Sequence, residues 1–264
     1  MLESIILGTI QGIAEWLPVS SEGLIFFVKT NFFNNNESIS QITHLALWLH
    51  LGTFFAALIF FRKDVVRLTK FLFQFKKAEE GEQKMLIFLI VATAISGLLG
   101  LFILFLINKY GNNLNITANF INLAVGLLLL ITAGLQFRAK NDGLRGAKEL
   151  RNSDSIILGI TQGLASLPGL SRSGLTISAM LIRKIDNTLT LKLSFLMSLP
   201  IVLGGNIVLN LDKFALNLES VVGVLASFIF GYITIGALLK IAKKINFGWF
   251  VLGFGVLMIA TVFL

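Results

Sequence analysis

Apolar residues in this chain come in long runs, where a soluble helix would alternate apolar and polar faces. The run from Ile87 to Ile107 contains no charged residue in 21 positions. A helix of that length crosses the hydrocarbon core of a bilayer. The pattern predicts six membrane spans, at residues 45–61, 85–107, 118–137, 193–211, 218–239 and 247–264. The predicted fold is therefore an all-α membrane protein forming one integral membrane domain.

Two further apolar segments, residues 4–28 and 156–182, are interrupted by glycine, proline and hydroxyl residues. Within them, residues 5–24 align without gaps on residues 156–175, and 10 of the 20 positions are identical. This similarity indicates an internal duplication. Interrupted apolar segments at corresponding positions of two halves are typical of re-entrant helical hairpins around a central site. Non-helical backbone at membrane depth is tolerated there because protein or water surrounds it.

The duplication predicts two halves, residues 1–150 and 151–264, each with one re-entrant hairpin and three transmembrane helices. Because three is odd, the second half is expected to be inverted relative to the first. Four loops predicted on one side hold 7, 5, 3 and 3 basic residues, against one each in three loops opposite. The basic loops are 62–84, 138–155, 183–192 and 240–246. The positive-inside rule assigns them to the cytoplasm and both termini to the outside.

Composition supports a membrane protein and excludes several other classes. Charged residues make up 14% of the chain, well below the roughly one quarter typical of soluble domains, and mean hydropathy is +0.84. The absence of cysteine excludes disulfides and thiolate metal sites. A net charge of +8 in such a chain indicates cytoplasmic loops near anionic lipid, so no nucleic-acid partner is expected.

The second interrupted segment places hydroxyl groups around an arginine, Arg172, at the start of an apolar helix. Free N–H groups at a helix start form an anion cradle, and the arginine fork binds phosphate oxygens bidentately. A charge at bilayer depth marks a functional site by default. The alternative is that Arg172 pairs with Glu15 or with carbonyls and only holds the hairpins together. The residues predicted to bind the anion with it are Gly169, Ser171, Ser173 and Thr176.

The first interrupted segment carries the candidate acid–base chemistry. Gln11 and Glu15 are four residues apart and share a helix face. A carboxylate beside an arginine and an oxyanion can bind a divalent cation such as Mg²⁺ or Ca²⁺, act as a general base, or lock a salt bridge. Ser20 and Ser21 are candidates for a nucleophile or for a helix cap. Glu22 is expected to face the outer water.

Two other features are interpreted as structural. His50, at the mouth of an apolar span, is expected to be a hydrogen-bonded structural residue. Gly204 and Gly205 are interpreted as contacts between packed helices, because small residues let membrane helices approach closely.

Four stretches of the chain resemble the undecaprenyl-diphosphate phosphatase family associated with bacitracin resistance. They are LGTIQGIAEWLPVSSEG, LHLGTFFAALIFFRKD, LASLPGLSRSGLTIS and LSFLMSLPIVLGG, in register over most of the chain. The resemblance implies an inverted-repeat membrane fold. It also implies hydrolysis of a polyprenyl diphosphate to the monophosphate at the outer side of the plasma membrane. This reaction would recycle the carrier lipid for cell-wall glycans.

Position by position, the resemblance makes Glu15 a catalytic acidic residue and Ser21 a proposed nucleophile. The phosphate-binding motif of the family falls on Ser171, Arg172, Ser173 and Thr176. The chain departs from the family at Leu24, where a histidine is usual, and at Gln11, where glutamate is usual. The Tyr-Arg pair usual in the last span is also missing. Because position 24 lies about one helical turn after Ser21, its side chain is expected to point toward the same pocket.

Three alternatives stay open from the sequence. A lipid-phosphate carrier or flippase also suits inverted repeats around a midplane site, and it needs Arg172 but no base. A catalytically impaired relative is compatible with the missing histidine. A small-anion transporter is the third alternative. The expected partners are the polyprenyl diphosphate lipid and the membrane, and the chain is compatible with a homodimer.

Overall fold

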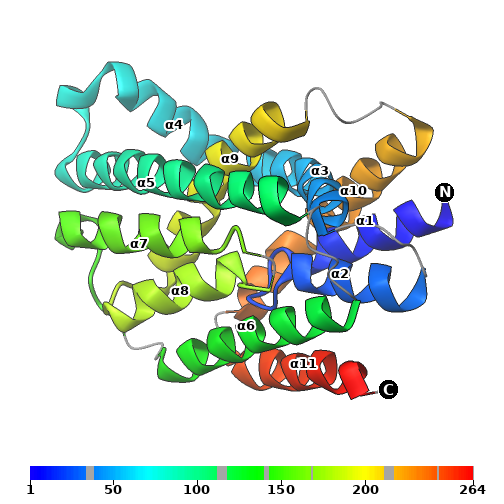
Figure 1. Cartoon of the computed structure of the whole chain (residues 1–264). Coiled ribbons are helices and arrows are strands. Elements are labelled where there is room, and N and C mark those ends of the chain that lie inside the picture. The colour runs from blue at the N-terminus through cyan, green and yellow to red at the C-terminus, as the bar shows by residue number, and fades with distance from the viewer. Residues whose placement is uncertain are drawn as a thin grey trace.

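The computed structural model describes residues 1–33, 39–111, 118–139, 143–167, 169–210, 217–242 and 244–263. Within these ranges the chain forms α-helices and three short 3₁₀ turns, without a named β-strand (Figure 1). The α-helices are α1 (Leu2–Ala14), α2 (Ser21–Phe32), α3 (Ile39–Phe60), α4 (Arg62–Phe73), α5 (Glu80–Gly111), α6 (Ala118–Arg138), α7 (Asn152–Leu164), α8 (Arg172–Ile182), α9 (Asn187–Asn210), α10 (Leu218–Ala242) and α11 (Gly248–Ala260). The 3₁₀ turns are η1 (Phe75–Lys77), η2 (Ala147–Glu149) and η3 (Thr261–Phe263).

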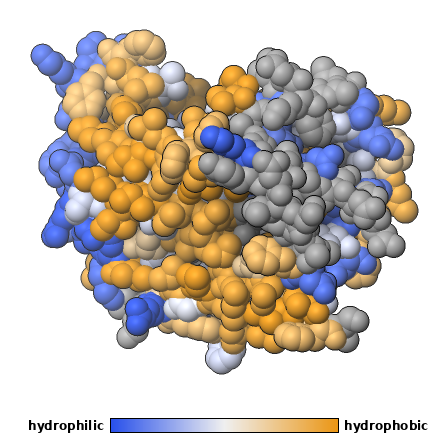
Figure 2. Space-filling model, in the orientation of Figure 1, coloured by the Kyte–Doolittle hydropathy of each residue, from blue (hydrophilic) through white to orange (hydrophobic). Residues whose placement is uncertain are grey.

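All six runs predicted to be spans are largely helical where the structure describes them. Four described helices, α3, α5, α9 and α10, are long and apolar enough to cross a membrane by length and composition. α6 and α11 carry shorter apolar stretches. Hydrophobic residues cover most of the middle of the face in Figure 2, and hydrophilic residues gather toward its left edge. The chain is therefore a multi-pass membrane protein.

The basic segment predicted as a loop between α3 and α5 contains a helix of its own, α4. Leu68 of α4 is buried against the core, whereas Val66 and Phe73 are exposed. Asp64 accepts a hydrogen bond at 2.5 Å from Nζ of Lys192, at the start of α9. α4 is therefore amphipathic and is tied to the end of a membrane-spanning helix.

The two interrupted segments of the repeat each form a helix, a break and a second helix. α1 ends at Ala14 and α2 starts at Ser21, where the Ser20 hydroxyl accepts a hydrogen bond from the N–H of Gly23 at 3.1 Å. The second segment ends α7 at Leu164 and caps α8 with Ser171, which accepts from the N–H of Gly174, also at 3.1 Å. The same cap thus occurs at equivalent positions of the repeat.

Glycines set how closely the first helix of each segment approaches its neighbour. A Cβ at Gly8 of α1 would lie 2.3 Å from the carbonyl oxygen of Gly223 in α10. In the equivalent position, a Cβ at Gly159 of α7 would lie 2.7 Å from the Cβ of Ile95 in α5. The α1–α10 and α7–α5 pairs are therefore close glycine-mediated packings of the kind that membrane helices use.

A buried carboxylate, Asp154, fixes the second segment at the end where it meets loops 138–155 and 183–192. The Asp154 side chain accepts hydrogen bonds from Arg145 at 2.7 Å, from Arg183 and from the N–H of Arg151 at 2.8 Å. Burial opposes ionisation of Asp154, but these hydrogen bonds outweigh it and hold the pKa of the carboxyl below its ordinary value. These contacts join the start of α7 to the end of α8.

Asp154→Asn is expected to destabilise the protein by about 3 kcal/mol, because it leaves two arginines without their shared partner. Since the folded-state pKa of Asp154 is lowered, its contribution is present at neutral pH and is lost as pH falls through that pKa. Thermal unfolding in detergent at pH 7 and at low pH measures both effects. An unchanged melting temperature at pH 7 would contradict the prediction.

Candidate functional site

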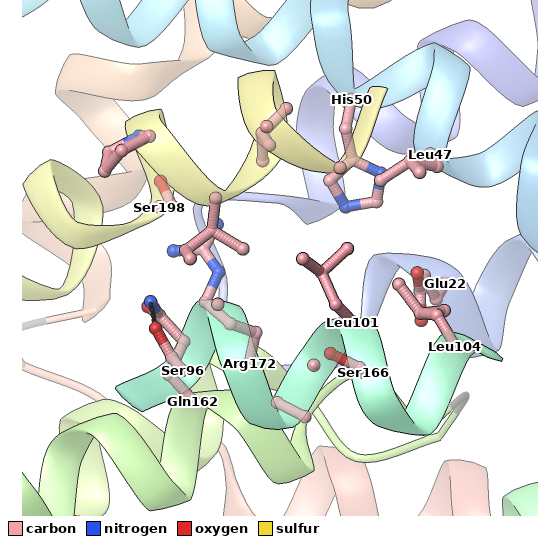
Figure 3. A pocket seen from close by; sticks show the side chains of 18 of the residues that line it. Glu22, Leu47, His50, Ser96, Leu101, Leu104, Gln162, Ser166, Arg172 and Ser198 are labelled. Carbon is pink, nitrogen blue, oxygen red and sulfur yellow. Dashed lines mark hydrogen bonds between the residues drawn. The ribbon is translucent and has the colours of Figure 1, made fainter. Parts of the chain in front are cut away.

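The breaks in the two repeated segments meet at a cavity of about 560 Å³. Its lining comes from both breaks and from α3, α5 and α9 (Figure 3). Arg172, Glu15 and Ser21 lie on its wall together with His50 and Glu22. Residues 157 positions apart in sequence are therefore neighbours in one polar site.

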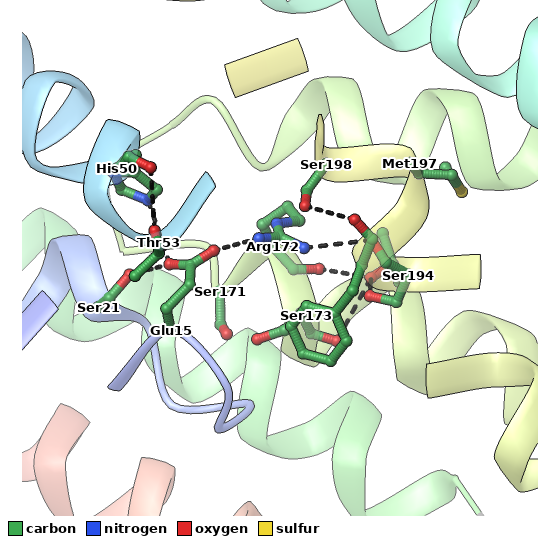
Figure 4. Close-up of polar contacts among 12 residues, drawn as sticks. Glu15, Ser21, His50, Thr53, Ser171, Arg172, Ser173, Ser194, Met197 and Ser198 are labelled. Carbon is green, nitrogen blue, oxygen red and sulfur yellow. Dashed lines mark hydrogen bonds and ion pairs between the residues drawn. The ribbon is translucent and has the colours of Figure 1, made fainter. Parts of the chain in front are cut away.

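Arg172 is held from three directions at this wall. One guanidinium nitrogen donates to Glu15 Oε1, and another donates to the carbonyl oxygen of Ser194 at 3.2 Å (Figure 4). The guanidinium carbon lies 5.6 Å from the ring centroid of Phe195, a cation–π contact. The salt bridge considered as the structural alternative for Arg172 is thus present. It connects the two segments at the cavity, where an incoming anion can compete with the carboxylate.

Glu15 is the most heavily bonded group of the site, and its side chain is only 6% exposed. Its second oxygen, Oε2, accepts hydrogen bonds from Ser21 Oγ at 2.8 Å and from Gln11 Nε2 at 2.9 Å. His50 Nε2 lies 3.2 Å from the same oxygen. The carboxylate is therefore placed to receive the proton of the Ser21 hydroxyl.

His50 contacts acceptors with both ring nitrogens. Nδ1 lies 2.6 Å from the carbonyl oxygen of Ala46, and Nε2 faces Glu15. A carbonyl and a carboxylate only accept hydrogen bonds, so His50 is the donor in each contact for which its nitrogen carries a hydrogen.

A second set of contacts lies beside the first and joins the two breaks to each other and to their neighbours. Ser173 Oγ donates to the carbonyl oxygen of Leu17 at 3.0 Å, and Gln136 Nε2 donates to that of Pro18 at 2.5 Å. Thr176 Oγ1 lies 2.7 Å from Ser194 Oγ. The first two bonds satisfy carbonyls between α1 and α2 and fix that backbone against α8 and α6, and the third joins α8 to α9.

The predicted site residues divide into two groups. Glu15, Ser20, Ser21, Ser171, Arg172 and Ser173 line the cavity. Gln11 and Thr176 lie behind that lining. Gln11 donates a hydrogen bond to Glu15, and the Thr176 hydroxyl bonds to the carbonyl oxygen of Arg172 and to the Ser194 hydroxyl. Gly169 adopts a φ of 99°, which favours glycine, and a Cβ there would lie 2.9 Å from Val125 of α6. Pro168, part of the predicted motif, lies outside the described residues.

Three of the expectations concern neighbouring residues. His50 is hydrogen-bonded to its own helix as expected, and it also contacts the Glu15 carboxylate and lines the cavity. Glu22 lines the same cavity. Leu24 is partly buried against an apolar cluster that includes Ile25 and Phe26, and it is not among the described residues of the cavity wall. The expectation that position 24 points into the cavity is therefore wrong.

The sequence reasoning missed the contribution of α9. Ser194 and Phe195 hold Arg172, and Ser198 lines the cavity. The stretch LSFLMSLPIVLGG was noted only for its family resemblance, although hydroxyls spaced four apart in an apolar helix were the available signal.

The described residues do not by themselves form a cage for a metal ion. Among the described residues, no group of three or more histidine, cysteine, aspartate or glutamate side chains is gathered. Both oxygens of Glu15 already accept bonds from protein donors. A hard cation at Glu15 would therefore need further oxygen ligands from a bound diphosphate, which is how Mg²⁺ commonly binds.

Fold and site together define a class of protein: a helical membrane protein with a buried cavity built around an arginine, a carboxylate and hydroxyls. A model of the family described as Bacitracin resistance protein BacA matches residues 4–258. The chain belongs to this family.

Similar proteins from three organisms carry the same name, undecaprenyl-diphosphatase. The one from Methanococcoides burtonii is 40% identical over 266 residues, covering 99% of this chain and 98% of the relative. The one from Haloarcula marismortui is 34% identical, covering 94% and 92%. The one from Alkaliphilus metalliredigens is also 34% identical, covering 92% and 90%.

Proposed function

We infer that this protein is a membrane phosphatase that converts undecaprenyl diphosphate to the monophosphate. Membership of the family and the names of its relatives support this substrate. The observation that carries the chemistry is the meeting of Arg172, Glu15 and Ser21 on one cavity wall. They supply an anion-binding fork, a base and a hydroxyl within hydrogen-bond reach of one another.

In the proposed reaction, the diphosphate takes the place of Glu15 on the Arg172 guanidinium. Arg172 is suited to this exchange because Ser194 and Phe195 hold it in position independently of Glu15. Ser171 and Ser173, on either side of it, add hydroxyls at the start of α8. The free N–H groups of that helix start favour the negative charge that develops on the phosphoryl group.

The proposed nucleophile is the Ser21 hydroxyl. Its oxygen bonds to the terminal phosphorus, its proton passes to Glu15 Oε2, and the bond from that phosphorus to the bridging oxygen breaks. The lipid monophosphate leaves with the bridging oxygen, and water then releases phosphate from Ser21 with return of the proton. A water held by Ser21 and Glu15 is the alternative nucleophile, and it gives the same products in one displacement.

We further propose that a divalent cation, Mg²⁺ or Ca²⁺, binds together with the substrate. Glu15 is the protein ligand proposed for it, and the diphosphate oxygens would complete its coordination. When bound, such a cation would neutralise charge on the phosphoryl oxygens.

Phosphate release from undecaprenyl diphosphate by the purified protein tests the proposed function directly. A carrier or flippase would bind the lipid through Arg172 but release no phosphate. The bonds that Glu15 makes to Ser21 favour the enzyme, because a headgroup carrier has no need of a base aimed at a hydroxyl.

His50 is proposed to position Glu15. His50→Ala is expected to lower kcat about tenfold, because the carboxylate loses one of its donors and gains freedom to turn away from Ser21. His50→Gln, which keeps an N–H donor, is expected to recover part of the loss. Phosphate-release kinetics on both variants measure the effect. Equal activity of His50→Ala and the wild type would contradict the role.

We propose that residues 1–150 and 151–264 form two inverted repeats, each with a re-entrant hairpin and three transmembrane helices. The repeated Ser20 and Ser171 caps support the duplication. The exchange of partners supports the inversion: α1 of the first half packs on α10 of the second, and α7 of the second packs on α5 of the first.

We also propose that the protein lies in the plasma membrane with both termini outside and the active site facing outward. Figure 1 shows the two termini at the same side of the molecule. The orientation across the membrane is inferred from the four basic loops, because their 18 basic residues are expected on the cytoplasmic side.

Single cysteines in this cysteine-free chain test that topology. Leu144 is 90% exposed and Leu218 is 69% exposed. In intact cells, a membrane-impermeant maleimide is expected to label Leu218→Cys. It should label Leu144→Cys only after the membrane is permeabilised. Labelling at position 144 in intact cells would overturn the proposed orientation.

A further inference from the structure

One side of α4 alternates basic and apolar side chains. Lys63, Val66, Lys70 and Phe73 are spaced three, four and three residues apart, so they follow one another along the same side of the helix. All four are exposed, Val66 by 69% and Phe73 by 86%. The other side of α4 packs against the core, mainly through Leu68. These four exposed residues are the α4 face.

The two lysines of the α4 face have no anionic partner within the described part of the chain. No hydrogen bond or ion pair joins the side chain of Lys63 or Lys70 to another described residue. Arg67, which turns toward α5, is by contrast paired with Asp64 at 3.0 Å and with Glu82 at 3.3 Å. The protein therefore neutralises the inward-facing charge of α4 and leaves the outward-facing charges available to a partner.

The α4 face lies where a membrane span ends. α4 begins at Arg62, directly after α3 ends at Phe60, and Figure 1 shows it at the side of the molecule opposite both termini. In the same corner of Figure 2, hydrophilic and hydrophobic residues lie side by side. At such a position an exposed apolar side chain enters the boundary between headgroups and acyl chains, and a lysine extends toward the phosphates.

We propose that the α4 face binds anionic phospholipid in the leaflet that we propose to be cytoplasmic. Lys63 and Lys70 contact the phosphates, and Val66 and Phe73 contact the acyl chains. A soluble polyanion would match the lysines but would leave both apolar residues in water. A zwitterionic lipid carries its own positive group, so two unpaired lysines favour a headgroup of net negative charge. This binding surface is separate from the proposed phosphatase site and does not depend on that activity.

Because the chain contains no cysteine, a fluorescent probe can be attached to this face alone. Thr69 is exposed and lies between Val66 and Phe73, so a fluorophore on Thr69→Cys reports lipid contact there. The labelled protein is reconstituted into phosphatidylcholine vesicles that contain a fixed fraction of brominated lipid. The brominated lipid is either phosphatidylglycerol or phosphatidylcholine. Bromine quenches only nearby fluorophores, so comparing the two lipids gives their relative binding constant at the α4 face.

Two double variants of the labelled protein are compared. Lys63→Gln/Lys70→Gln removes the two charges of the α4 face. The matched control, Lys84→Gln/Lys148→Gln, removes two other exposed lysines from the same proposed side of the membrane, and both of these interact with Glu80. Both variants lower the net charge by two, so a difference between them reports on the α4 face and not on total charge. Elution as a single species and an unchanged melting temperature verify folding.

We expect phosphatidylglycerol to bind at the probe roughly tenfold or more tightly than phosphatidylcholine, because each lysine near an anionic surface contributes about fivefold. This preference should fall to about one in Lys63→Gln/Lys70→Gln and stay at the level of the labelled parent in the control.

Three results would overturn the proposal. The first is equal quenching by the two lipids in the labelled parent. The second is an equal loss of preference, or no loss, in the two double variants. The third is the absence of quenching by either lipid, which would show that the α4 face does not contact the bilayer and is open to a soluble partner. None of these results bears on phosphate release, so the surface and the proposed function can fail separately.

Discussion

Arg172→Lys is expected to lower kcat/KM for undecaprenyl diphosphate by a factor of about 10² to 10³ although the positive charge is kept. The guanidinium donates to Glu15 and to the carbonyl of Ser194 from separate nitrogens while it stacks on Phe195. A lysine ammonium is a point charge and cannot reproduce this planar fork. KM should rise and kcat should fall, because the guanidinium binds the substrate and also stabilises the charge that develops on the phosphoryl group.

Arg62→Lys is the matched control for this change. Arg62 is an exposed arginine of α4, and its guanidinium donates to the carbonyl oxygen of Ile59 at 3.1 Å. The control should retain wild-type kinetics. Full activity in Arg172→Lys would show that Arg172 only holds the two segments together, and the site assignment would be wrong.

Glu15→Gln is expected to lower kcat by a factor of about 10² to 10⁴, the usual contribution of a general base. The amide can still accept a hydrogen bond from Ser21, but it cannot take up the proton. Because the carboxylate competes with the diphosphate for Arg172, removing its charge should leave KM unchanged or lower it in assays without an added divalent cation. A residue with a purely structural role would not lower kcat while improving binding.

Glu22→Gln removes the same charge from the same cavity and serves as the comparison. Ser21 and Arg172 both donate to Glu15 and not to Glu22, so Glu22→Gln should lower kcat by less than about tenfold. Comparable losses in Glu15→Gln and Glu22→Gln would indicate that the cavity needs negative charge in general, and that Glu15 is not the specific base.

Local composition was enough to predict most of the helical framework. An apolar run of 21 residues such as Ile87–Ile107 must satisfy its own backbone hydrogen bonds in lipid, and only a helix does so within one segment. The Ser20 and Ser171 caps also follow from local sequence, because serine before a helix start satisfies a free N–H group. The duplication and the unusual intramembrane Arg172 then indicated where the chemistry lies.

Tertiary packing decided which side chains enter the site. His50 reaches Glu15 because α3 packs against α1, and Leu24 turns into an apolar cluster although it lies one turn from Ser21. A Cβ at Gly204 would meet no heavy atom within 4 Å, whereas one at Gly8 would meet the backbone of α10, although both glycines look alike in sequence. The sequence shows the periodicity of each helix, but which face of the helix lies at a cavity depends on neighbours that are distant in the sequence. Only the packed structure therefore shows which side chains line the site.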